Sequence, residues 1–192
     1  MARLLINHGM GNWRWPDHWQ RHLANEARKK GHLVSYVQFP SPDHPNTQDW
    51  QNLLVTETQL LQESGSGELL FVGHSLGSLN FLYAAQTGVL PAKFDRVLLV
   101  APADPGLLPD LEIERIDLAK VDLAKAAKSV QIVASDNDQW LPRGIQASFG
   151  QPLGIEPVVI PGAKHLSLAD GWGYWQGVID WVDNPSADLT NR

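Results

Sequence analysis

The chain has 192 residues, of which 43% are hydrophobic and 19% are charged, so it can bury a full core and is not a disordered segment. Its formal net charge of −6 and the lack of any basic cluster larger than Arg28-Lys29-Lys30 argue against nucleic acid and anionic membranes as partners. The absence of Cys excludes disulfides, thiolate nucleophiles and Cys-ligated zinc, and it fits a reducing, cytoplasmic compartment.

Apolar runs and amphipathic segments alternate along the whole chain. In chain order they predict a strand at 3–6, a helix at 17–30, a strand at 33–39, a helix from 46 or 47 to about 63, a strand at 68–72, a helix to about 87, strands at 96–101, 130–134 and 157–160, and a helix at 172–182. Because the first strand follows the start Met directly, no signal peptide is expected. No apolar run is long enough to span a membrane.

The ends of these elements carry capping signals. Asp17 is expected to cap the first helix, and Asn46 or Thr47 the second. Gly31 is expected to end the first helix. The polar tail, residues 184–192, is expected to fray.

Alternating strands and helices with nearly all-apolar strands predict a parallel sheet covered on both faces, in a single α/β domain over residues 1–192. No repeat or linker interrupts the pattern. The longest interval without a strand, residues 102–129, is too short for a multi-helix cap domain, so we expect an open site.

A strand-turn-helix pattern surrounds the sequence Gly73-His74-Ser75-Leu76-Gly77. An apolar run precedes it, and a helical pattern follows. Gly-x-Ser-x-Gly in that setting is typical of a nucleophile elbow, in which a strained turn exposes a serine hydroxyl in front of the first helix amides. The two glycines would be required because strand and helix backbones pass close together there.

Further chemistry is expected where later strands end, because loops at the carboxyl ends of parallel strands gather at one edge of the sheet. Ser75, Asp138 and His165 follow three different strands in the order Ser, Asp, His. His165 could take the proton of Ser75, and Asp138 could orient the imidazole. Asp104 and Asp136 are alternative acids; Asp138 is favoured because a Trp-Leu-Pro run after it is typical of a helix start.

The tetrahedral intermediate of such a reaction needs two backbone amides as an oxyanion hole. We expect these to be the amides of Leu76 and Met10, with Gly9 and Gly11 allowing the backbone to approach. His8 could line the site or pack beside it, and His74 is expected to brace the elbow. The histidines at 18, 22, 32 and 44 are expected on the surface.

The eight Trp residues fall into two sets. Four lie on predicted helices and are expected in the core: Trp19, Trp50, Trp175 and Trp181. The other four follow predicted catalytic loops: Trp13, Trp15, Trp140 and Trp172. Either some of this second set, with His8, Gly9 and Gly11, wall a shallow apolar substrate pocket, or they only pin the loops.

Metal and dinucleotide sites are not predicted. The sequence has no His-x-x-x-His, His-Glu-x-x-His or calcium-loop spacing, and no Gly-x-Gly-x-x-Gly follows the first strand. The leading interpretation is therefore a cofactor-free serine hydrolase of the carboxylesterase type, acting on small acyl esters, thioesters or amides. A catalytically silent relative that binds a partner protein, and a lyase on the same scaffold, remain alternatives.

Three segments resemble small serine hydrolases related to human retinoblastoma-binding protein nine: residues 73–77, residues 135–142 and residues 162–165. The resemblance implies an α/β-hydrolase without a lid, with about six parallel strands in the order 2-1-3-4-5-6 and with Ser75, Asp138 and His165 as the triad. Retinoblastoma-protein binding is linked in that family to a Leu-x-Cys-x-Glu segment. This chain has no Cys, so that partner is not expected.

Overall fold

The computed structural model describes residues 1–107 and 113–192 and contains one sheet of six parallel strands in the order β2-β1-β3-β4-β5-β6. The strands are β1 (Arg3–Asn7), β2 (Leu33–Ser35), β3 (Leu69–His74), β4 (Phe94–Val100), β5 (Ala127–Ser135) and β6 (Val158–Ile160). The predicted parallel sheet and its strand order are confirmed.

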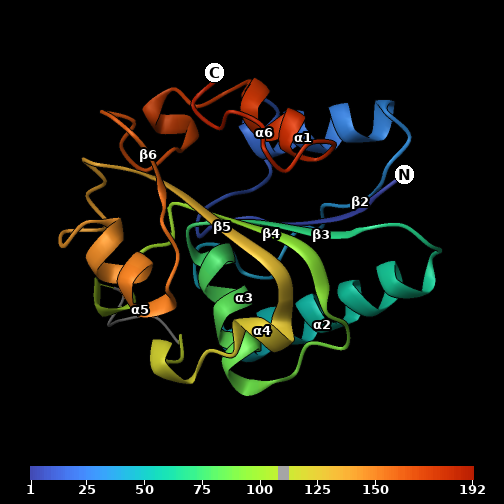
Figure 1. Cartoon of the computed structure of the whole chain (residues 1–192), viewed down its shortest axis with the longest axis horizontal. Coiled ribbons are helices and arrows are strands. Elements are labelled where there is room, and N and C mark those ends of the chain that lie inside the picture. The colour runs from blue at the N-terminus through green and yellow to red at the C-terminus, as the bar shows by residue number, and fades with distance from the viewer. Residues whose placement is uncertain (108–112) are drawn as a thin grey trace.

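Helices cover both faces of this sheet (Figure 1). One face carries α1 (Trp19–Lys29) and α6 (Gln176–Trp181), and the other carries α2 (Thr47–Glu63) and α3 (Leu76–Thr87). Two apolar cores result, one on each face of the sheet. Every residue of β3 is buried, as a central strand covered on both sides requires. The four Trp residues predicted for the core are all buried.

Two strands differ most in length from their predictions. β2 ends at Ser35 rather than at residue 39, because it pairs with β1 only over Leu33–Ser35. The Phe39 amide donates instead to the imidazole Nε2 of His8. β5 begins at Ala127 rather than at residue 130, because residues 127–129 already pair with β4 and Lys128 forms an ion pair with Asp95 of β4 at 2.6 Å.

The helix ends also correct the sequence analysis. His18, not Asp17, caps α1: its Nδ1 accepts a hydrogen bond from the Gln20 amide. Asn46, not Thr47, caps α2. The last helix, α6, begins only at Gln176, so Trp172 precedes it and follows a 3₁₀ turn, Leu168–Asp170.

The C-terminal tail packs against the rest of the chain and is not frayed. Leu189 is buried, and its carbonyl oxygen accepts a hydrogen bond from the indole N–H of Trp175. The Gly177 amide likewise donates to the carbonyl of Asn191. A buried anchor and these two long-range hydrogen bonds outweigh the polar composition of the tail.

The interval 102–129 contains, in its described part, two 3₁₀ turns (Pro105–Leu107 and Leu118–Lys120) and the short helix α4 (Leu123–Ala126). We expected no cap domain in this interval. Part of the interval, residues 108–112, lies outside the described residues. Among the described helices, none combines the length and apolar character needed to cross a bilayer.

Candidate active site

Ser75 occupies the sharp turn between β3 and α3. Its φ of 51° and ψ of −119° lie outside the regions that L-residues usually adopt. The Ser75 amide donates to the carbonyl of Val100 at 2.9 Å, which ties the strained turn to the neighbouring strand β4. Such strain persists only where the surroundings enforce it, and it is concentrated at functional sites.

The glycines on either side of Ser75 are required by close backbone contacts. A Cβ at Gly73 would lie 2.8 Å from the Ser78 amide nitrogen, and a Cβ at Gly77 would overlap the carbonyl oxygen of Asn7. The strand-turn-helix geometry expected from Gly-x-Ser-x-Gly is therefore present.

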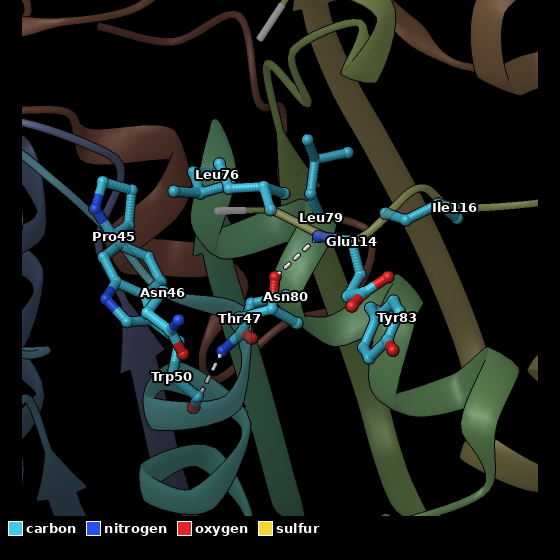
Figure 2. Close-up of a pocket in the computed structure, with 11 residues that line it drawn as sticks. Pro45, Asn46, Thr47, Trp50, Leu76, Leu79, Asn80, Tyr83, Glu114 and Ile116 are labelled. Atoms are coloured by element: carbon cyan, nitrogen blue, oxygen red, sulfur yellow. Dashed lines mark hydrogen bonds between the residues drawn. The ribbon is translucent and has the colours of Figure 1, made fainter. Parts of the chain in front are cut away.

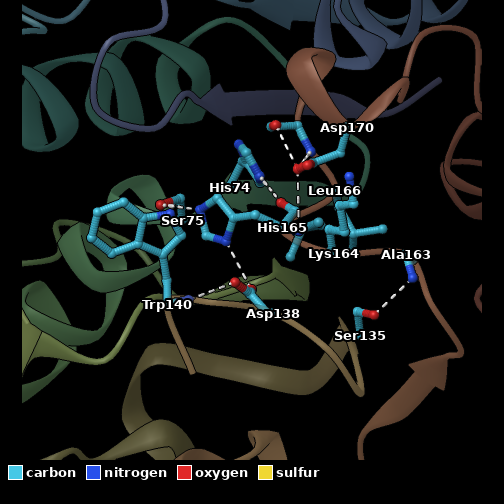
Figure 3. A network of polar contacts seen from close by, with 12 residues as sticks. His74, Ser75, Ser135, Asp138, Trp140, Ala163, Lys164, His165, Leu166 and Asp170 are labelled. Atoms are coloured by element: carbon cyan, nitrogen blue, oxygen red, sulfur yellow. Dashed lines mark hydrogen bonds and ion pairs between the residues drawn. The ribbon is translucent and has the colours of Figure 1, made fainter. Parts of the chain in front are cut away.

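Ser75, His165 and Asp138 form a continuous hydrogen-bonded chain (Figure 3). His165 Nε2 lies 2.8 Å from Ser75 Oγ, and His165 Nδ1 lies 2.7 Å from Asp138 Oδ2. An Asp138 carboxylate can only accept, so Nδ1 carries the imidazole proton and Nε2 presents its lone pair to the Ser75 hydroxyl. The Asp138 side chain is fully buried, and that of His165 is 11% exposed.

The two alternative acids are occupied elsewhere. Asp104 contacts Arg143 at 3.2 Å and accepts a hydrogen bond from the Gly106 amide. Asp136 accepts one from the Gly162 amide. The helix expected after Asp138 is absent: a turn follows, in which the second carboxylate oxygen of Asp138 accepts the Trp140 amide at 2.9 Å.

The end of β5 holds the loop that carries His165. Three consecutive side chains, Ser135, Asp136 and Asn137, accept hydrogen bonds at 2.7–2.8 Å from the amides of Ala163, Gly162 and Lys164, respectively. Ser135 Oγ also donates to Asn137 Oδ1 at 2.7 Å. We call Ser135, Asp136 and Asn137 the clamp. It fixes the three residues directly before His165 relative to the strand that leads to Asp138.

Three further side chains hold this loop from other sides. His74 Nε2–H donates to the His165 carbonyl at 2.9 Å, Asp170 accepts the His165 amide at 3.2 Å, and the Trp172 indole donates to the Ala163 carbonyl at 3.0 Å. Burial, followed by the proximity of His165, lowers the pKa of His74 well below its usual value. A neutral His74 can brace the His165 loop without repelling an imidazolium at His165.

Ser75 opens into a cavity of about 200 Å³. Gly9, Met10 and Gly11 line it, and a Cβ at Gly9 would lie only 3.0 Å from the Ser75 Cβ. The loop after β1 therefore approaches the serine as closely as its glycine allows. His8 does not line the cavity: it packs beneath the loop, with Nε2 accepting the Phe39 amide and Nδ1–H donating to the Gly9 carbonyl.

Of the four loop Trp residues, Trp15 alone lines the cavity that contains Ser75. Trp13 is 50% exposed and donates its indole N–H to Asp43. Trp140 is half-buried, with its ring 6.2 Å from the His165 ring. Trp172 is buried and pins the His165 loop, which fits the alternative, structural role.

Three polar residues that line this cavity were not predicted as site residues: Asn12, His18 and Ser167. His18, expected on the surface, is 3% exposed and lines the cavity with Ser75. His32 is also more buried than expected, since its side chain is 7% exposed. The signal for His18 was its position directly before an amphipathic helix, where a capping side chain is held against the sheet. Leu168 and Ala169 line the same cavity.

A second, narrower pocket lies beyond Leu76, between the start of α2, one side of α3 and residues 113–116 (Figure 2). It is lined mainly by apolar side chains, including Trp50 and Leu79, and its cavity volume is about 20 Å³. Ser75, Asp138 and His165 do not line it, so the larger cavity is the candidate active site. Among the described residues, no three His, Asp or Glu side chains are placed to share a metal ion.

The parallel sheet order and the strained serine between β3 and α3 define the α/β-hydrolase fold. Solved structures of that fold resemble the chain over nearly all of its length. The ydeN gene product of Bacillus subtilis has a TM-score of 0.76 at 22% identity, covering 95% of this chain and 97% of its own. A YdeN-like hydrolase described as putative, from Pectobacterium atrosepticum, has a TM-score of 0.71 at 21% identity, covering 95% and 90%.

The sequence profile of the serine hydrolase family matches residues 4–184, and the chain belongs to that family. The resemblance to the relatives of retinoblastoma-binding protein nine is thereby confirmed at the level of the family. A third solved structure, a serine hydrolase without a lid from Xanthomonas campestris, has a TM-score of 0.60 at 16% identity and covers 88% of this chain and 74% of its own. No curated protein matches the chain in sequence.

Proposed function

We propose that this serine hydrolase cleaves small, uncharged acyl esters, thioesters or amides through an acyl-enzyme intermediate on Ser75. The observation that carries the proposal is the chain of two short hydrogen bonds, 2.8 Å from Ser75 to His165 and 2.7 Å from His165 to Asp138. Nucleophile, base and orienting carboxylate are each within reach of the next, which is the geometric requirement for this chemistry.

In the first half-reaction, Ser75 Oγ forms a bond to the carbonyl carbon while its proton moves to His165 Nε2. Asp138 stabilises the resulting imidazolium through its hydrogen bond to Nδ1. The tetrahedral intermediate collapses when the bond to the leaving group breaks, and His165 returns the proton to that group. Water then attacks the acyl-enzyme by the same route, which releases the acid and restores Ser75.

The negative oxygen of the intermediate is assigned to the amides of Leu76 and Met10. Leu76 is the first residue of α3, so its N–H has no acceptor within the helix and lies at the positive end of the helix dipole. Met10 lies in the loop whose Gly9 contacts Ser75. Loss of one such donor costs about 3 to 4 kcal/mol of barrier in other hydrolases.

The cavity favours neutral substrates. The residues that line it include no Asp, Glu, Lys or Arg, and burial lowers the pKa of two of its histidines, His18 and His74. Two structural neighbours, at 16% identity, are described as a lipolytic enzyme and a monoacylglycerol lipase. Those descriptions support an ester as the scissile bond.

Pre-steady-state hydrolysis of p-nitrophenyl acetate tests the proposal. Where deacylation is slower than acylation, an acyl-enzyme gives a burst of p-nitrophenol equal to the enzyme concentration, followed by slower turnover. The Ser75→Ala variant should show neither. A folded wild-type protein that releases no p-nitrophenol above the buffer rate would contradict the proposal.

A further inference from the structure

We propose that His18 is a substrate-binding residue that selects esters carrying a second, uncharged hydrogen-bond acceptor beside an apolar group. This inference rests on the proposed function, because it concerns the substrate of the same Ser75 site. It assigns a binding group to the wall of the cavity, in addition to the groups that break the bond.

The position of His18 is fixed by its neighbours. Its ring is 5.5 Å from the Trp19 ring and 5.6 Å from the His74 ring, measured between centroids. His74 in turn lies 5.2 Å from the His165 ring. The side chain is almost entirely buried, yet it lines the cavity into which Ser75 opens.

The hydrogen bonding of His18 determines which nitrogen is a donor. Nδ1 accepts the Gln20 amide at 3.1 Å, as the cap of α1, so Nδ1 has no proton. The proton of the neutral ring is therefore on Nε2. Burial, with smaller contributions from His8 and His22, lowers the pKa of His18 to about 3, so the ring stays neutral at working pH.

The Nε2–H group of His18 has no hydrogen-bond partner among the described residues. This nitrogen is not one of the fully enclosed polar atoms that lack a partner, so it is accessible from the cavity, and a ligand oxygen can accept its hydrogen bond there. Trp15, Leu168 and Ala169 line the same cavity and offer apolar contacts. A substrate that matches both features has an ether, ester or amide oxygen next to a short alkyl or aryl group.

Two isosteric ester pairs test this specificity. The first compares p-nitrophenyl pentanoate with p-nitrophenyl 3-methoxypropanoate, which places an ether oxygen in the acyl group. The second compares butyl acetate with 2-methoxyethyl acetate, which places it in the alcohol. Each kcat/KM is divided by the rate of hydroxide hydrolysis of the same ester, so that intrinsic reactivity cancels.

The decisive variant is His18→Asn, because Asn retains the ability to cap α1 but cannot place a ring N–H in the cavity. His18→Ser, also a capping residue, serves if the first variant does not fold. The matched control is His22→Asn, a histidine on the same helix that does not line the cavity. Thermal unfolding by circular dichroism verifies that each protein is folded.

We expect the wild type and His22→Asn to prefer the ether member of at least one pair by about tenfold. His18→Asn should lose this preference, measured as the ratio of kcat/KM between the two members of each pair. Equal preference in wild type and His18→Asn, or no preference in either pair, would overturn the inference if the wild type releases p-nitrophenol from p-nitrophenyl acetate above the buffer rate. Absence of that release would overturn the proposed function and this inference together.

Discussion

Two loops flank Ser75, and they differ in how many of their backbone amides are bonded to side chains and in how many of their side chains face solvent. The His165 loop, residues 161–171, is fixed through its backbone: consecutive amides from residue 162 to residue 165 donate to side chains of the clamp and of Asp170. The Met10 loop, residues 8–17, presents side chains to solvent instead. Met10 is 37% exposed, and Trp13 and Trp15 are each 50% exposed.

This difference follows from what each loop does in the proposed mechanism. Proton transfer needs His165 within hydrogen-bond distance of both Ser75 and Asp138, so small displacements are costly. Contact with a substrate tolerates more variation, because apolar side chains act without directional bonds. Changes in the backbone of the His165 loop should therefore lower kcat. Replacing the exposed side chains of the Met10 loop, which leaves the Met10 amide in place, should mainly raise KM.

The largest effects are expected from the hydrogen-bonded chain itself. Ser75→Ala and His165→Ala should each lower kcat for p-nitrophenyl acetate by roughly 10,000-fold or more, because each removes the shared proton-transfer route. The double variant should be little worse than either single variant. Steady-state kinetics with titrated enzyme measure this, and independent, multiplicative losses would argue against one coupled unit.

A smaller loss is expected when the clamp is weakened. Ser135→Ala leaves the Ala163 amide without its acceptor, at a cost of about 1 to 3 kcal/mol, and it loosens the backbone before His165. We expect kcat to fall about 10- to 100-fold while KM stays within about twofold.

The matched control is Ser148→Ala. Ser148 is also buried, but its hydroxyl has no hydrogen-bond partner within residues 1–107 and 113–192, so its removal should change neither kcat nor KM. Equal effects of the two substitutions on kcat would contradict the role of the clamp in positioning His165.

Stability should depend on pH through the buried histidines between the two loops. Burial lowers the pKa of His8 to about 4 and that of His18 to about 3, and it also lowers that of His74. Between those values and the usual pKa of about 6.5, the unfolded chain binds more protons than the folded one, so stability falls as pH falls. Each such histidine contributes up to about 1.4 kcal/mol per pH unit.

Urea unfolding at pH 7.5 and pH 5.0 measures this dependence. The free energy of unfolding should be lower by several kcal/mol at pH 5.0. His18→Asn should reduce the difference by up to about 2 kcal/mol. Replacing the exposed His44 by Gln should leave it unchanged. Equal stability of the wild type at both pH values would be incompatible with three buried neutral histidines.

The smallest effect is expected at the rim of the cavity. Trp13 and Trp15 are equally exposed, but only Trp15 lines the cavity. Trp15→Ala should therefore raise KM for p-nitrophenyl butyrate about 3- to 10-fold with little change in kcat, while Trp13→Ala should leave both constants near wild type. The reverse ranking would place the apolar binding surface elsewhere.

The fold could be predicted from the sequence because its strands are continuous apolar runs. Every residue of β3 is buried, as its continuous apolar sequence predicts for a strand covered on both faces. The edge strand β2 was predicted too long, because its apolar character continues past the last residue that pairs with β1. The start of α6 was misplaced because Trp172 and Trp175 follow a helical spacing, although Trp172 is buried through a turn.

The parts of the candidate site that could be predicted are those formed by residues adjacent in the sequence. Gly73 and Gly77 predict the turn at Ser75. A side chain at either position would clash with nearby backbone atoms, which explains why both residues are Gly. Asp138 was selected for a helix start that the structure lacks. The acceptors of the clamp and the burial of His18 could not be inferred, because both depend on segments far apart in the sequence.

Reaction of the folded protein with a fluorophosphonate tests the central claim most directly, because this probe phosphonylates only a serine that an adjacent base activates. The account predicts one adduct per chain, mapped by peptide mass spectrometry to Ser75, no adduct in Ser75→Ala, and strongly slowed reaction in His165→Ala. A folded wild-type chain that stays unlabelled, or that is labelled at another residue, would contradict Ser75 as the nucleophile.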